Sequence, residues 1–171
     1  TYTGGTTIAN GVLVVSADAQ LGTAPSSARA GHLVLEDGGA LEADGSFTLH
    51  ANRGVDLQTG TTTLSVGSGD TLVYGGVIAG AGNLVISGSG RLTLSGNNTY
   101  VGATTISDAS LVISSDSNLG AAPVSATAGH LSLDNGSLIV PTGNTVTIDA
   151  NRGMYLGAGG ATIETVGTAD V

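Results

Sequence analysis

Two repeated polar pairs are the first residues in this chain that could do chemistry. Asn52-Arg53 and Asn151-Arg152 each stand directly before a glycine. An arginine presents paired N–H donors, so a repeated pair of this kind could bind a carbohydrate or an anion. The glycines mark tight turns and favour a structural role instead. In that role each arginine bridges neighbouring turns of the chain to an acid such as Asp56 or Glu164.

The histidines and one glycine-flanked acid are weak candidates for a metal site. His32 and His130 occupy equivalent places before predicted strands, but the counterpart of His50 is Asp149. Because a metal site needs several ligands within reach, we interpret the two equivalent histidines as turn-edge residues bonded to backbone. Asp70, in GSGDTL, lacks the spacing of calcium-binding nonapeptide repeats. The sequence therefore predicts no metal and no cofactor.

Paired acidic positions suggest carbohydrate cleavage, and their surroundings argue against it. Glu36-Asp37 and Asp134-Asn135 are placed like the carboxylate pairs of pectin-cleaving β-helices. Adjacent residues on a strand point to opposite faces, and the glycine after each pair favours a turn. The chain has no lysine and no cysteine, which excludes Schiff-base catalysis, thiol nucleophiles and disulfides. Without a cluster of Asp, Arg and His, we expect no enzyme and assign no catalytic residue.

The composition suits a narrow core and a polar, acidic surface. The 171 residues include 29 Gly but only 3 Pro, 1 Phe and no Trp, so the apolar content is mainly Val, Leu, Ile and Ala. The hydrophobic fraction of 40% argues against disorder. The net charge is −9, and all four basic residues are arginine. We therefore expect neither nucleic acid nor an anionic membrane as a partner.

The elements that would position these residues recur along the chain. YTGGTTI at residues 2–8 returns as YVGATTI at 100–106, which is 98 residues later, and ANRG at 51–54 returns 99 residues later at 150–153. Such a period is typical of a stacked array whose units bury their apolar faces against their neighbours. We expect residues 1–171 to form a single β-helix segment of about 1.7 copies, cut from a longer chain, with Val171 in the place of Leu72.

Short β-branched runs fill both copies and predict strands rather than helices. Runs such as HLVL (32–35) and RLTL (91–94) alternate with period two and end at turn residues. A sandwich would not need its sequence to return, so an all-β parallel β-helix is favoured over an antiparallel sandwich. At about 20 residues per coil, we expect eight or nine coils in a rod about 40 Å long. The leucines predicted to point inward are Leu13, Leu33, Leu35, Leu92, Leu94, Leu111, Leu131 and Leu133.

Residues 80–113 carry a family pattern. The segment GAGNLVISGSGRLTLSGNNTYVGATTI resembles the autotransporter-associated β-strand repeat, also called the passenger-associated transport repeat. Gly80, Gly82 and Leu84 begin the pattern, and Asn98-Thr99-Tyr100 is near its end. Residues 1–15 resemble the tail of a preceding copy. The resemblance implies a right-handed parallel β-helix in the passenger of a type V secreted protein.

The resemblance also implies location and role. We expect a structural stalk or spacer at the surface of a Gram-negative bacterium, exported through the outer membrane by a C-terminal translocator barrel of the parent chain. Such a segment assists export and folding and displays adhesive regions. The alternatives are an adhesin surface that binds surface glycans or host proteins directly, and a carbohydrate-active β-helix enzyme. An ice-binding solenoid is disfavoured because its threonine pairs would have to recur on every coil. We also expect exposed ends to associate end to end.

Overall fold

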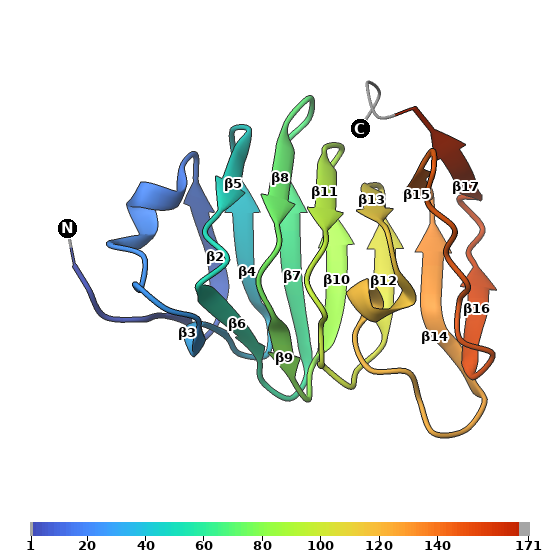
Figure 1. Cartoon of the computed structure of the whole chain (residues 1–171), viewed down its shortest axis with the longest axis horizontal. Coiled ribbons are helices and arrows are strands. Elements are labelled where there is room, and N and C mark those ends of the chain that lie inside the picture. The colour runs from blue at the N-terminus through green and yellow to red at the C-terminus, as the bar shows by residue number, and fades with distance from the viewer. Residues whose placement is uncertain (1, 168–171) are drawn as a thin grey trace.

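The chain folds as a three-faced parallel β-solenoid. The computed structural model describes residues 2–167, so Thr1 and the predicted place of Val171 lie outside the described residues. Between residues 29 and 94 successive strands visit three sheets in turn, and between residues 104 and 166 they alternate between two of these sheets (Figure 1). Every strand pair described is parallel. Only two single-turn 3₁₀ segments interrupt the strands of the described part. The all-β prediction is confirmed.

The second and third sheets run along most of the rod, whereas the first sheet is confined to its N-terminal part. The first sheet contains β1 (Thr6–Ile8), β3 (Arg29–Leu35), β6 (Arg53–Leu57) and β9 (Ile78–Gly80). The second contains β2 (Gly11–Val15), β4 (Gly39–Ala43), β7 (Thr61–Val66), β10 (Asn83–Ser87), β12 (Thr104–Ser107), β14 (Thr127–Asp134) and β16 (Arg152–Leu156). The third contains β5 (Phe47–Leu49), β8 (Thr71–Tyr74), β11 (Arg91–Leu94), β13 (Ser110–Ile113), β15 (Gly136–Pro141) and β17 (Ala161–Val166). The 3₁₀ segments are η1 (Asp18–Leu21) and η2 (Asp116–Leu119).

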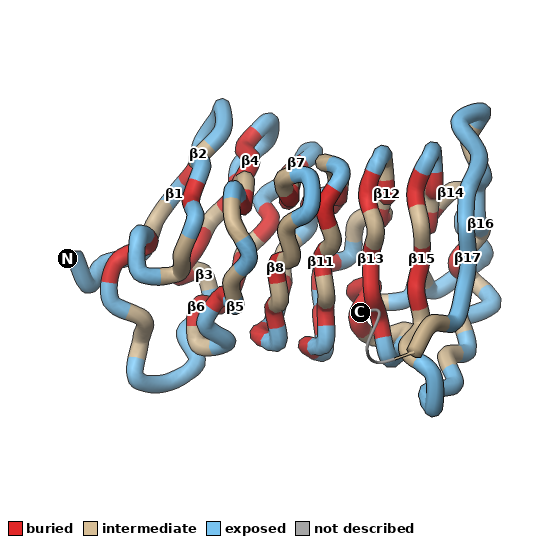
Figure 2. Tube along the Cα trace, turned by 90° about the horizontal axis from the view of Figure 1, so that it is seen from above, coloured by how far each residue is buried: buried red, intermediate tan, exposed pale blue. Residues whose placement is uncertain are grey.

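Ladders of aliphatic side chains fill the space between the sheets. Alternate residues of each strand point inward, so one column of the second sheet stacks similar residues rung upon rung. That column contains Leu13, Leu41, Leu64, Ile86, Ile106 and Leu133. Figure 2 shows that buried positions recur along the strands of successive coils. Seven of the eight leucines predicted to point inward are buried, and Leu13 is half-buried because it lies on the outermost strand of its sheet.

The number of coils differs from the prediction. The largest sheet has seven strands, so the solenoid has about seven coils rather than the predicted eight or nine. Paired residues are 19 positions apart between Leu92 and Leu111 but 28 apart between Gly11 and Gly39. The longer coils contain η1 or η2 and the loop after it, and these lengthen a coil without adding a rung. With about 4.8 Å between strands, the stack is about 30 Å long.

The sequence repeat is not a whole number of coils. β1 lies in the first sheet, whereas its sequence counterpart β12 lies in the second sheet, four coils further along. In the same way β2 belongs to the second sheet and its counterpart β13 to the third. The 98-residue repeat therefore advances the solenoid by four coils and one face.

Glycines allow the shortest coils to stack closely. A Cβ atom on Gly96 would lie 1.9 Å from the Gly76 carbonyl oxygen, and one on Gly102 would lie 2.1 Å from that of Gly82. Both contacts are with the backbone of the preceding coil, and neither distance leaves room for a side chain. The glycines of the family pattern thus mark places where one turn lies directly on another.

Candidate functional site

Arg53 is the centre of a buried clamp across successive coils. Its Nε donates to Asp18 Oδ1 at 2.8 Å, and its Nη2 donates to Asp18 Oδ2 at 3.0 Å. The remaining donors reach carbonyl oxygens of the segment from η1 onward. Nη1 bonds to Leu21 O at 2.7 Å, and Nη2 bonds to Gly22 O at 2.6 Å. Arg53 is 1% exposed, so its guanidinium is enclosed by the protein's own acceptors.

The second copy repeats this clamp with the same partners. Arg152 Nε donates to Asp116 Oδ1 at 2.9 Å. Its Nη1 bonds to Leu119 O at 3.1 Å and its Nη2 bonds to Gly120 O at 2.5 Å. The clamp therefore recurs although the two arginines begin strands of different sheets, β6 and β16.

The asparagine of each pair fixes a loop beside the clamp. Asn52 Nδ2 donates to Pro25 O at 2.8 Å, and Asn151 Nδ2 donates to Pro123 O at 2.9 Å. We call residues 23–28 the first loop and residues 121–126 the second loop. Most of their residues are exposed. The Asn-Arg turns thus hold the bases of two equivalent exposed loops.

A tyrosine of the family pattern lies beneath each clamped segment. Tyr100 is completely buried, and its hydroxyl bonds to Thr104 Oγ1 at 2.7 Å. Burial raises the pKa of Tyr100 to about 12. A Cβ atom on Gly120 would lie 2.9 Å from this ring, so only glycine fits at this turn. Tyr2 makes the same bond to Thr6, but it is 45% exposed. Tyr100 therefore packs inside the core, and Tyr2 does so only in part.

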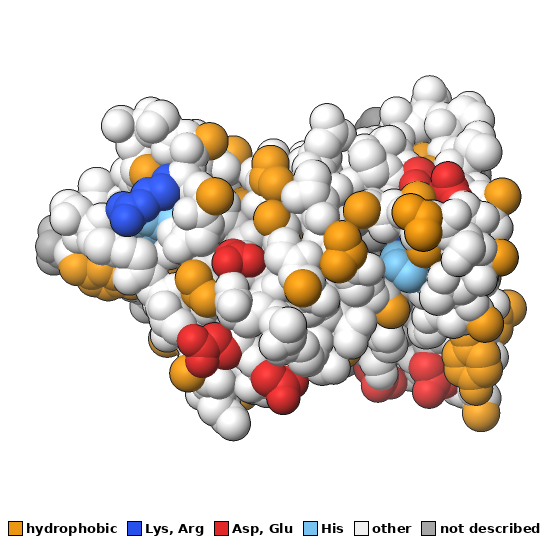
Figure 3. All heavy atoms as spheres, turned by 90° about the horizontal axis from the view of Figure 1, so that it is seen from below, with side chains coloured by type: hydrophobic (Ala, Val, Ile, Leu, Met, Phe, Trp, Pro, Cys, Tyr) orange, Lys and Arg blue, Asp and Glu red, His pale blue; other side chains and the backbone are white. Residues whose placement is uncertain are grey.

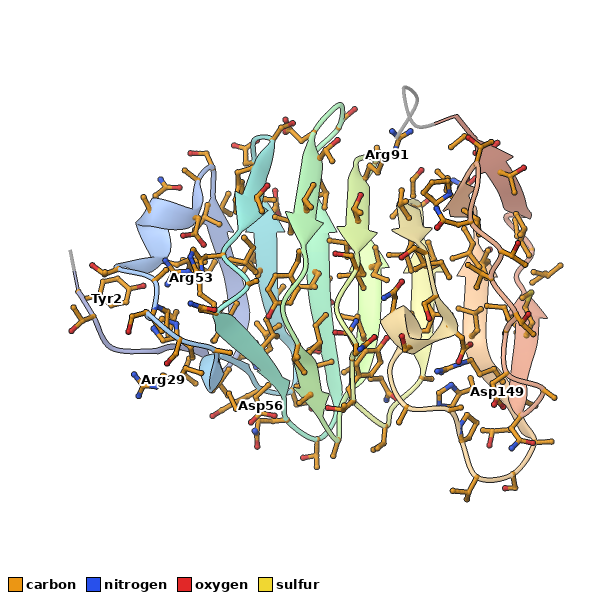
Figure 4. All side chains as sticks on the ribbon, viewed as in Figure 1. Tyr2, Arg29, Arg53, Asp56, Arg91 and Asp149 are labelled. Carbon is orange, nitrogen blue, oxygen red and sulfur yellow. The ribbon has the colours of Figure 1, made fainter. Side chains whose placement is uncertain are left out.

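Electrostatics favour the ion pair between Asp18 and Arg53. Burial raises the pKa of Asp18, but the bonds from Arg53 and the His50 N–H outweigh it, and the pKa lies below its ordinary value. The acids that hold the arginines are Asp18 and Asp116, not Asp56 and Glu164 as the sequence suggested. Figure 4 shows Arg53 directed toward η1, whereas Asp56 lies at the outer edge. A guanidinium with these internal partners is unsuited to an external ligand.

The equivalent histidines lie inside strands rather than at turn edges. His32 in β3 and His130 in β14 are both buried. His130 Nδ1 lies 3.3 Å from Arg152 Nη1. Burial and the charges of Arg53 and Arg29 hold the pKa of His32 below its ordinary value, against the opposing effect of Asp18. Both rings therefore belong to the surroundings of the clamps, and the turn-edge interpretation is wrong.

The acidic positions singled out in the sequence make structural bonds. Asp37 Oδ1 accepts from the Thr61 N–H, Asp134 Oδ1 accepts from the Gly159 N–H, and Asp70 Oδ1 accepts from Ser46 Oγ. Within residues 2–167, no group of three or more His, Asp or Glu side chains is placed to hold a metal ion. In the same part of the chain, no helix is long and apolar enough to cross a membrane.

Sequence reasoning missed a pair of buried asparagines. Asn98 Oδ1 accepts from the Ile78 N–H at 2.8 Å, and Asn98 Nδ2 donates to Asn118 O at 2.6 Å. Asn118 Nδ2 in turn donates to Gly96 O at 2.9 Å. Asn98 thus joins β9, its own coil and η2.

The sequence repeat carried a signal for the acids of the clamps, which sequence reasoning also missed. Asp18 and Asp116 recur at the same place in VVSADAQLG and VISSDSNLG.

The charged side chains of this chain are mostly acidic, with 13 Asp and Glu against 4 Arg. On the face drawn in Figure 3, acidic side chains are scattered along the rod, and the basic side chains lie at the end that holds the first strands. A hollow of about 510 Å³ lies beside the first loop. Its lining is mainly Ala and Gly, with Arg29, Asn52 and Val77 among the larger residues.

Two comparisons with known proteins found similar sequences. The family model described as the passenger-associated-transport-repeat matches residues 1–15 and 84–113. Over 113 residues the chain is 42% identical to the adhesin BmaC autotransporter of Brucella suis biovar 1, an alignment that covers 66% of this chain and 3% of that protein. No solved structure matches the chain. The chain therefore carries matches to the passenger-associated transport repeat, and its similarity to an autotransporter adhesin indicates a passenger segment that is exported through the outer membrane to the cell surface.

Proposed function

We propose that this chain is a rigid spacer within a longer autotransporter passenger, where it assists export and folding and carries adhesive regions away from the cell. The observation behind this proposal is the pair of repeated clamps. In each clamp the arginine donates its hydrogen bonds to residues of another coil of the same chain, so these donors hold coils together. The partner in the parent chain is a C-terminal translocator, and the chain has no catalytic task.

The spacer role has a measurable length. One repeat adds four coils and one face, or about 21 Å of rod. A passenger with one further 98-residue unit should hold a fluorescent N-terminal marker about 21 Å further from the cell, measured by energy transfer to a membrane dye. The matched control adds 98 residues of a flexible Gly/Ser sequence. If both insertions gave the same broad distribution of distances, the chain would not be a rigid spacer.

Direct adhesion is a second candidate function. The hollow beside the first loop favours it, because exposed Arg29 and half-buried Asn52 offer polar contacts next to small apolar residues. The curated relative is named an adhesin. Saturable binding of the purified chain to host cells or a glycan array, lost in Arg29→Ala, would support direct adhesion. The spacer proposal expects no saturable binding.

A further inference from the structure

The strands at the two ends of the described solenoid pair on one side only. β1 and β2 begin the first and second sheets and pair with β3 and β4; we call this end the head. β16 and β17 end the second and third sheets at the opposite end of the rod, which we call the tail (Figure 1). Met154, Leu156 and Ile163 are exposed at the tail. Open strand edges beside apolar side chains can accept further strands, and here these must be parallel to continue the ladders.

The first copy shows what covers the counterpart of the tail. β6 and β7 are the first-copy counterparts of β16 and β17, and β9 and β10 pair with them. β9 has three residues and β10 has five, with two residues between the strands. β1 and β2 have the same lengths, three and five residues, and the same two-residue connection. The head of a second molecule therefore has the dimensions of the strand pair that covers Leu57 and Leu64 in the first copy.

A second molecule covers both open tail strands only if it is rotated. Stacked without rotation, its β2 would lie on β16, but β17 would receive η1, which packs beside β5, the first strand of the third sheet. Turned by one face, its β1 lies on β16, its β2 lies on β17, and its η1 lies on the first face. Within one chain the sequence counterparts β12, β13 and η2 occupy these same three faces, since Asn98 joins η2 to β9 of the first sheet.

We infer that this chain associates head to tail with a second copy of itself, with β1 and β2 of one molecule paired to β16 and β17 of the next and each molecule turned by one face of the solenoid. Such a contact is heterologous and can add copies in a line. A tail-to-tail contact is disfavoured because it would bring two exposed Glu164 side chains into one interface, whereas residues 2–15 of the head contain no charged side chain. The inference goes beyond the spacer role and does not depend on it.

Single cysteines can test this contact, because the chain has no cysteine of its own. In the first copy Ala79, the central residue of β9, pairs with Asp56, the counterpart of Tyr155. Thr7, the central residue of β1, should therefore lie opposite Tyr155 of the next molecule. Without rotation Tyr155 would instead face Val12, because these two residues belong to one column of the second sheet. All three side chains to be changed are exposed.

The experiment mixes Tyr155→Cys with an equal amount of Thr7→Cys or of Val12→Cys under a mild oxidant, at a concentration where light scattering shows association. We expect the disulfide between Thr7→Cys and Tyr155→Cys to form about tenfold faster than the one between Val12→Cys and Tyr155→Cys. Dilution to the monomer should remove this difference. Equal rates, or a faster Val12→Cys pair, would overturn the rotated contact, and fastest joining of Tyr155→Cys to itself would overturn the head-to-tail contact. The spacer role is tested separately, by the marker distance in the passenger with one added repeat.

Discussion

Buried Arg53 forms an ion pair with half-buried Asp18, 35 residues earlier in the chain, with 2.8 Å between Nε and Oδ1. Arg152 and Asp116 repeat the pair at 2.9 Å. In both copies the arginine starts a strand and the acid starts a 3₁₀ segment. Each clamp therefore fixes one of the long coils, where the strand ladder is interrupted.

Removing the arginine should destabilise the solenoid strongly. Arg53→Ala removes the guanidinium from the Asp18 carboxylate and leaves the carbonyl oxygens of Asp18, Leu21 and Gly22 without this donor, and we expect a loss of about 3–5 kcal/mol in the free energy of unfolding. Arg29→Ala is the control, because Arg29 is exposed. This variant should change the free energy of unfolding by less than about 0.5 kcal/mol. Urea unfolding followed by circular dichroism measures both. Equal costs would show that the clamp contributes nothing.

The glycines of the family pattern should not tolerate a methyl group. In Gly96→Ala the new Cβ would overlap the Gly76 carbonyl oxygen, and the expected cost is about 1–3 kcal/mol or more. Gly4→Ala is the matched change, since no atom lies within 4 Å of its Cβ position, and should change stability by less than about 1 kcal/mol. Thermal melts of the two variants compare them. A harmless Gly96→Ala would mean that successive turns are further apart than described.

Stability should fall as the pH drops below about 6.5. The pKa of His32 is lowered in the folded protein, so below the unfolded-state value the folded chain binds fewer protons than the unfolded chain. Protonation therefore favours unfolding, by at most about 1.4 kcal/mol per pH unit for one group. Below about pH 4 the lowered pKa of Asp18 adds a second loss.

Two variants separate this effect from general acid sensitivity. His32→Gln should remove the decline in unfolding free energy between pH 7.5 and 5.5. His50→Asp should retain it, because it copies the second copy, where Asp149 Oδ1 accepts from the Asn151 N–H as His50 Nδ1 does from the Asn52 N–H. An unchanged decline in His32→Gln would assign the effect to another group.

The face formed by β16 and β17 should associate with other molecules. Leu156 is 56% exposed and Ile163 is 55% exposed, whereas their first-copy counterparts Leu57 and Leu64 are buried. β9 and β10 cover those counterparts in the first copy. We expect the mass measured by light scattering to rise with concentration, and the combined change Leu156→Lys with Ile163→Lys to abolish the rise. Val101→Lys, at an exposed valine between β11 and β12 and away from both ends, should not. A monomer at every concentration would contradict this.

Much of the fold could be predicted from the sequence. The returning sequence and the alternating leucines indicated a parallel solenoid, and Leu92 and Leu94 are buried as expected. The coil number could not be predicted, because the length of a coil varies with loops that add no rung. The partners of Arg53 and Arg152 were also out of reach of spacing alone. Asp56 is only three residues from Arg53, but the stacking of coils brings Asp18 closer.

The rotation between copies was not predicted either. The match between copies is close enough to suggest that equivalent residues lie in one column. The structure instead places Thr7 on β1 of the first sheet and its counterpart Thr105 on β12 of the second. The reason is arithmetic: coils of 19 to 28 residues do not divide evenly into 98.

A pair of spin-label distances tests this rotation most directly. Val12 and Thr105 lie in one column of the second sheet, four rungs apart through Ala40, Thr63 and Val85. Their backbones should be about 19 Å apart. Thr7 and Thr105 are also four coils apart but on different faces. Pulsed dipolar spectroscopy on Val12→Cys/Thr105→Cys and Thr7→Cys/Thr105→Cys should give the longer distance for the second pair. A second-pair distance equal to or shorter than the first would contradict an advance of four coils and one face.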